Sequence, residues 1–192
     1  NSKGVKKLIL DLRHCSTGNP ADGVDLANWF LDKGAIGSVK GQRTDEQKFV
    51  ADAAKQVWKN QMVVIVNRGT AGAAEVLAAA LLDSKRADVV GERSYGDASI
   101  RKALSLDDGS AVILSVAKYY APNGKAIQDT GVVPNYPMND TMLVSEEDPD
   151  GDGIPNAPSD KPKEDTLMKK AIELLSGVKT VAGINPEAAM KR

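Results

Sequence analysis

Met62-Val63-Val64-Ile65-Val66 is the stretch of sequence that decides the fold, together with the Ala- and Leu-rich residues 72–84 that follow it. An unbroken apolar run of strand length between polar neighbours is typical of a strand that is covered on both faces. Residues 72–84 are apolar around almost the whole helical circumference, which predicts a helix buried on most sides. A buried strand that leads through a Gly-containing turn into a buried helix indicates an α/β protein.

The other strands are expected from similar patterns. Apolar and β-favouring runs predict strands over residues 5–12, 35–40, 88–90, 100–106, 111–116 and 118–120. Asp108-Gly109 is a hairpin turn signal between two of these strands. Residues 44–60 fit either a strand followed by a short helix or one continuous helix, and we favour the first.

Helices are expected before and after these strands. Asp22 can cap a helix whose apolar positions follow helical spacing and which ends near Lys33-Gly34. An amphipathic pattern predicts a packing helix over residues 164–175, and a short helical piece can begin at Asn185-Pro186. Strands and helices therefore mix along the chain, as they do in α/β proteins.

The composition excludes several classes of function. Lys and Arg number 25 against 26 Asp and Glu, so the net charge of −1 produces no field that would hold nucleic acid or an anionic membrane. No apolar run approaches the roughly 20 residues of a membrane span. Cys15 is the only cysteine, which excludes a disulfide within the chain.

Three segments, in order and with compatible gaps, resemble the carboxyl-terminal processing, or tail-specific, serine peptidase family. They are Leu10-Asp11-Leu12-Arg13 with its loop to Gly18, residues 63–75 with the helix and the Lys85–Glu92 region after them, and residues 119–134 from Tyr-Tyr-Ala-Pro-Asn-Gly-Lys to Gly-Val-Val-Pro. The resemblance covers roughly residues 5–135. It implies an α/β fold related to ClpP and crotonase, in which strand-strand-helix units form the core.

The resemblance also predicts the domain organisation, the cellular location and the partners of the protein. We expect a peptidase-like core over residues 1–135, an acidic Pro- and Gly-rich loop over 136–163, and a helical segment over 164–192 that packs on the core. The family implies an upstream PDZ domain, a periplasmic or extracellular location, and polypeptide segments or protein C-termini as partners. It requires no cofactor.

Members of this family use a serine nucleophile, a lysine base and a glutamine that orients the lysine. A hydroxyl is too weakly acidic to attack an amide unless a neighbouring base takes its proton. By resemblance these three positions fall on Gly72, Asp97 and Arg101, so none of the three side chains that the mechanism needs is present. The backbone N–H groups of an oxyanion hole would be those of Ala73 and of Thr17 or Gly18.

We therefore expect a domain that binds unfolded polypeptide or protein C-termini without hydrolytic activity of its own. The alternative is an active serine-type peptidase with a relocated or partner-supplied nucleophile, for example Ser99 with Lys102, or Thr70 with a nearby lysine. His14 and Cys15 are neighbours on an extended segment and point to opposite faces, so we interpret them as loop residues and not as a catalytic pair.

The acidic loop contains a candidate calcium site. Asp148, Asp150 and Asp152 alternate with other residues before Gly153, and Asn156 could be a further ligand. The pattern resembles the Asp-rich loops of thrombospondin-type calcium repeats. Ser159 stands where an EF-hand would have its closing glutamate, so an EF-hand is not expected, and a solvated acidic linker remains the alternative.

Overall fold

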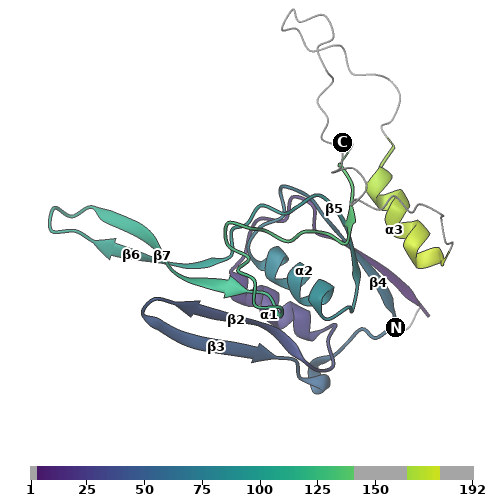
Figure 1. The fold of residues 1–192 in the computed structure, drawn as a ribbon, viewed down its shortest axis with the longest axis horizontal. Coiled ribbons are helices and arrows are strands. Elements are labelled where there is room, and N and C mark those ends of the chain that lie inside the picture. The colour runs from purple at the N-terminus through teal and green to yellow at the C-terminus, as the bar shows by residue number, and fades with distance from the viewer. Residues whose placement is uncertain (1–3, 141–163, 178–192) are drawn as a thin grey trace, which may run out of the picture.

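A computed structural model describes residues 4–140 and 164–177, which form two four-stranded sheets and three α-helices (Figure 1). One sheet is parallel throughout and has the order β1 (Lys7–Asp11), β4 (Gln61–Val66), β5 (Asp88–Gly91), β8 (Tyr136–Pro137). The other is antiparallel and has the order β3 (Thr44–Val50), β2 (Ala35–Gly41), β7 (Ala111–Tyr120), β6 (Ser99–Ser105). The expected α/β class is confirmed.

Strand β4 is covered on both faces, as its sequence predicts. Val64 and Val66 belong to the core cluster that contains α2 (Ala73–Asp83), whereas Val63 and Ile65 pack with α3 (Thr166–Ser176). Figure 1 shows α2 and α1 (Pro20–Asn28) between the parallel strands and the β2–β3 hairpin. The parallel sheet is thus a middle layer, and α2 is buried along nearly its whole length.

The prediction for α1 is wrong at both ends. The helix is capped by Asn19, whose side chain accepts the Ala21 N–H, and Asp22 instead accepts the Asn19 N–H to close a capping box. The helix ends at Asn28, not near Lys33, because the carbonyls that follow are bonded elsewhere. The Trp29 carbonyl accepts the N–H groups of residues 57 and 58, and the Phe30 carbonyl accepts from Gln56 and Arg86.

Two strand predictions need comment. Residues 44–60 form β3 followed by the short 3-10 helix η1 (Ala53–Lys55), which confirms the favoured alternative. Residues 111–116 and 118–120, expected as separate strands, are one strand, because β7 exchanges partners without breaking. It pairs with β6 as far as Lys118, and from Lys118 to Tyr120 it pairs with β2.

Helix α3 is attached to the parallel sheet by a charged contact as well as by apolar packing. The Arg13 guanidinium lies 2.8 Å from the Asp165 carboxylate and 2.7 Å from that of Asp11. Asp165 also caps α3 by accepting the Met168 N–H at 2.9 Å. The hydrogen bond from Arg13 lowers the pKa of Asp165 below its ordinary value.

We predict that Asp165→Asn lowers the free energy of unfolding by about 1 to 2 kcal/mol at pH 7, because the amide keeps the cap and loses the ion pair. The native-state pKa is depressed, so the contribution is complete above the ordinary carboxyl pKa of about 4 and is lost as pH falls through the lower native value. Urea unfolding at pH 7, 5 and 3 should therefore show a difference from wild type that shrinks only in acid.

Glu164→Gln is the matched control, since the Glu164–Lys169 pair is exposed at both ends. It should change the unfolding midpoint little at any of these pH values. A difference between wild type and Asp165→Asn that persists unchanged to pH 3 would show that charge is not what attaches α3.

Candidate active site

The turn between β4 and α2 has the geometry of a nucleophile elbow. Gly72 precedes the first residue of α2 and adopts φ 63° and ψ −123°, a conformation that is strained for residues with a side chain. A Cβ placed on Gly72 would lie 3.7 Å from the Gly18 carbonyl oxygen and 3.8 Å from that of Asp97. The structure thus brings together three of the residues that the sequence places at the site.

The carboxylate of Glu75 holds this arrangement in place. Glu75 is fully buried in the first turn of α2, where the helix dipole favours a negative charge. It accepts four hydrogen bonds, from the Gly72 N–H at 3.2 Å, the Ser94 hydroxyl at 2.5 Å, the Gly96 N–H at 2.6 Å and the Asp97 N–H at 2.7 Å. One side chain therefore fixes the elbow and the loop that carries Asp97.

Ser94 extends this network to the chain segment after β7. Its hydroxyl donates to Glu75 and accepts the Val132 N–H at 2.7 Å, while its own N–H donates to the Val132 carbonyl at 3.1 Å. A Cβ at Gly131 would come within 2.4 Å of the Ser94 carbonyl oxygen, so this approach requires glycine. The loop over residues 94–97 is held from both sides.

Asp97 and Arg101 form an ion pair at the edge of the site. The Arg101 guanidinium donates to the Asp97 carboxylate at 2.6 Å. The Asp97 side chain is 29% exposed and that of Arg101 is 54% exposed, so water partly screens the pair. The Asp97 carboxylate thus has a cationic partner on β6.

Gly18 and Ala73, whose N–H groups are expected to form an oxyanion hole, are neighbours in space. A Cβ at Gly18 would lie 3.7 Å from the Ala73 Cβ, so the loop after β1 reaches the start of α2. Ala73 is the first residue of the helix, and an N–H at that position has no intrahelical acceptor. The Ala71 N–H donates to the Cys15 carbonyl at 2.9 Å and holds the two segments side by side.

Asn67 connects the turn before α2 to the loop after β1 and to Asp140, a role that the sequence analysis missed. Its fully buried amide accepts the N–H groups of His14 and Gly69, donates to the Asp140 carboxylate at 2.9 Å and lies 3.1 Å from the His14 ring. His14 thus contacts an amide, and Cys15 is an exposed free thiol. The interpretation of this pair as loop residues agrees with these contacts, but the expected extended segment is wrong, because His14 has φ 56° and lies in a turn.

The Thr70 and Ser99 hydroxyls, the alternative nucleophiles, have hydrogen-bond partners other than lysine. The Thr70 hydroxyl is fully buried, donates to the Leu12 carbonyl at 2.8 Å and accepts the Asn67 N–H at 3.0 Å. The Ser99 hydroxyl lies 3.1 Å from that of Ser115 on the neighbouring strand. In the part of the chain that the structure describes, neither hydroxyl is hydrogen-bonded to a lysine.

The proposed calcium ligands Asp148, Asp150, Asp152 and Asn156 lie outside the described residues.

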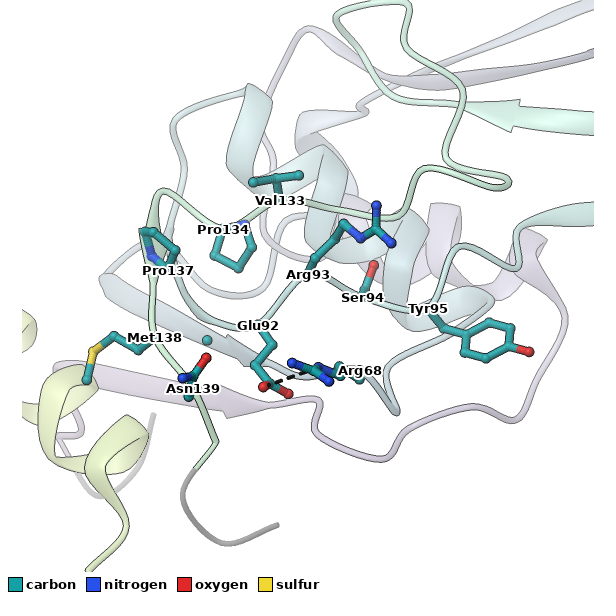
Figure 2. A pocket seen from close by; sticks show the side chains of 11 residues that line it. Arg68, Glu92, Arg93, Ser94, Tyr95, Val133, Pro134, Pro137, Met138 and Asn139 are labelled. Carbon is teal, nitrogen blue, oxygen red and sulfur yellow. Dashed lines mark ion pairs between the residues drawn. The ribbon is translucent and has the colours of Figure 1, made fainter. Parts of the chain in front are cut away.

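A hollow of about 690 Å³ lies at the carboxyl ends of the parallel strands and is lined in part by Ser94 and Tyr95 (Figure 2). Its lining includes Arg68, Glu92, Arg93, Ser94, Tyr95, Val133, Pro134, Pro137, Met138 and Asn139. Open α/β sheets commonly bind ligands at this end of their strands. The sequence analysis did not single out any of these residues as a site, although two arginines close to strand ends are a visible signal.

The fold and the elbow geometry define a peptidase-type α/β domain. The chain belongs to Peptidase family S41, whose sequence model matches residues 1–138. The expected relation to C-terminal processing peptidases is confirmed. Among the described residues, no helix is long and apolar enough to cross a membrane.

Relatives and solved structures agree with this assignment. The chain is 37% identical over 144 residues to the chloroplastic carboxyl-terminal-processing peptidase 2 of Arabidopsis thaliana, and 36% identical over 160 residues to the carboxy-terminal processing protease CtpA of Bacillus subtilis. These matches cover 74% and 83% of this chain. The solved photosystem II D1 C-terminal processing protease superposes with a TM-score of 0.65 at 37% identity, covering 72% of this chain and 36% of that one.

A putative peptidase from Parabacteroides merdae superposes with a TM-score of 0.69 at 20% identity, which supports the fold alone; the match covers 94% of this chain and 56% of that structure. The chain spans only 28% of the length of the Arabidopsis relative and 32% of that of the Bacillus relative. Membership of the family therefore describes this domain, and not the activity of a whole protein.

We predict that Glu75→Gln lowers the free energy of unfolding by roughly 2 to 4 kcal/mol. The amide nitrogen of Gln cannot accept a hydrogen bond, so at least one buried donor in the network loses its partner. Thermal or urea unfolding measures the loss. Glu46→Gln, on the exposed strand β3, is the matched control and should shift stability by less than about 0.5 kcal/mol. Equal stability of the two variants would contradict the central role of Glu75.

Proposed function

We propose that this domain binds unfolded polypeptide segments or protein C-termini and has no hydrolytic activity of its own. The proposal rests on the residues at the expected nucleophile and base positions. Gly72 has no side chain to attack an amide, and the Asp97 carboxylate is paired with Arg101 at 2.6 Å. A hydroxyl nucleophile and a free base are both required for the serine-type mechanism. The support for a peptide-binding role is the family, whose relatives include C-terminal processing peptidases.

An active peptidase with a relocated or partner-supplied nucleophile is the second candidate. The bonds of the Thr70 and Ser99 hydroxyls weigh against relocation, because among the described residues neither hydroxyl is hydrogen-bonded to a lysine, although Ser99 pairs with Lys118 in the register of β6 and β7. A nucleophile from a partner chain would have to reach Gly72, which is itself buried. We therefore favour binding without cleavage.

Restoring the three side chains tests this proposal. A Cβ at Gly72 meets its neighbours only at ordinary van der Waals distance, so serine fits, at a backbone strain of roughly 1 to 3 kcal/mol. We expect the wild-type domain neither to cleave an unfolded protein nor to react with a fluorophosphonate probe. The variant Gly72→Ser/Asp97→Lys/Arg101→Gln should gain labelling by the probe.

The matched control carries Gly72→Ala in place of Gly72→Ser, with the other two substitutions unchanged, and should stay unlabelled. Cleavage by the wild-type domain that disappears in Ser99→Ala or Thr70→Ala would establish the active alternative instead. Binding of unfolded protein is measured separately, by fluorescence anisotropy, because loss of cleavage alone does not demonstrate binding.

We also propose that the full-length protein carries an upstream PDZ domain and works in the periplasm or outside the cell. The support is the family, whose relatives include chloroplast and bacterial processing peptidases. Fractionation of cells that express the full-length protein tests the location, and recovery only with cytosolic markers would exclude it.

We propose further that the Asp148–Asn156 loop binds one Ca²⁺ through Asp148, Asp150, Asp152 and Asn156. Alternating carboxylates followed by glycine supply the hard oxygen ligands that Ca²⁺ prefers. Millimolar calcium should raise the melting temperature, chelator should reverse the rise, and Asp150→Ala should abolish it. An unchanged melting temperature would leave a solvated linker as the correct reading.

A further inference from the structure

The hollow at the carboxyl ends of β4, β5 and β8 carries unbalanced positive charge. Arg68 pairs with Glu92 through its Nε at 3.3 Å, but 79% of the Arg68 side chain is exposed. Arg93 is exposed, and its side chain has no ion pair or hydrogen bond within residues 4–140 and 164–177. The lining contains two guanidinium groups and one carboxylate, so its net charge favours an anion of single charge.

The same hollow has an apolar rim. Val133 is 62% exposed and Tyr95 is 70% exposed, and Met138 also lines the space. Figure 2 shows Arg93 between Val133 and Tyr95, with the Arg68–Glu92 pair to one side. A ligand that fits this lining therefore carries an apolar group next to its negative charge.

The walls of the hollow are held by backbone hydrogen bonds. The Tyr95 N–H donates to the Thr70 carbonyl at 2.9 Å, the Ser94 N–H to the Val132 carbonyl at 3.1 Å, and the Met138 N–H to the Gly91 carbonyl at 2.9 Å. Three chain segments are thus joined around the space. A hollow with fixed walls loses little entropy when a ligand enters.

A carboxylate of a polypeptide fits this chemistry best. A guanidinium matches the planar carboxylate with two parallel hydrogen bonds, and one net charge suits a monoanion better than a phosphate dianion. An apolar side chain next to that carboxylate would pack on Val133 and Tyr95. The carboxylate can come from a chain terminus or from an acidic side chain.

We propose that this hollow is a carboxylate-binding subsite for polypeptide, with Arg93 as the main partner of the carboxylate and Val133 and Tyr95 as the apolar support. The subsite rests on the polypeptide binding proposed above. Ser94 connects the subsite to the site around Gly72, because it lines the hollow and donates to Glu75, which also accepts the Gly72 N–H.

Fluorescence anisotropy with one labelled apolar peptide in three forms tests the subsite. The forms have a free C-terminal carboxylate, a C-terminal amide, and a C-terminal amide with one internal glutamate. We expect at least one carboxylate form to bind about tenfold more tightly than the plain amide, as for one charge-assisted hydrogen-bonded pair. Arg93→Gln should remove this preference, and added salt should weaken it.

Arg43→Gln, an identical change at the tip of the β2–β3 hairpin, is the matched control and should keep the preference. Tighter binding of the free-carboxylate form assigns the ligand group to a chain terminus, and tighter binding of the glutamate form assigns it to a side chain. Both outcomes support the subsite.

Equal binding of all three forms, unchanged by Arg93→Gln, would overturn the subsite and leave polypeptide binding intact. A carboxylate preference that survives Arg93→Gln would also overturn it, by placing the anion elsewhere. Absence of binding by every form would overturn both the subsite and the proposed function.

Discussion

The buried carboxylate of Glu75 is the interaction on which the rest of the site depends. A charge without contact with water is tolerated only when hydrogen bonds replace its hydration, and here four donors do so. These donors come from the elbow and from a loop some twenty residues later, so their relative positions are fixed by one side chain. The shape of the site is therefore maintained by a residue that takes no part in chemistry.

The ion pair between Asp97 and Arg101 shows why these two residues belong together. By resemblance they stand where the family has a lysine and a glutamine. A lone carboxylate at a partly buried position would be costly, whereas the adjacent guanidinium compensates its charge. Asp97 therefore has a structural partner in Arg101, in a pair that water partly screens because the two side chains are 29% and 54% exposed.

Local pattern predicts the centre of this fold well and its contacts poorly. The apolar run of β4 and the mostly apolar helix α2 could be predicted directly, because burial on several sides excludes most polar residues. The start of α1 could not be predicted from the sequence, because Asn19 and Asp22 are both favourable N-cap residues and only the geometry selects between them. The helix end, the part played by Asn67 and the open guanidinium of Arg93 depend on segments far away in sequence. One sign of the role of Glu75 is visible in the sequence, because Glu75 is the only charged residue of α2 before Asp83 at its end.

The positive φ of Gly72 limits which single substitutions the site can accept without a loss of stability. Glycine occupies this conformation without penalty, so the elbow that would strain a serine is relaxed in the present chain. A single step to serine would restore the strain without supplying a base, and a single step from Asp97 to lysine would set two cations against each other beside Arg101. A first substitution at either position is thus expected to lower the stability of the domain.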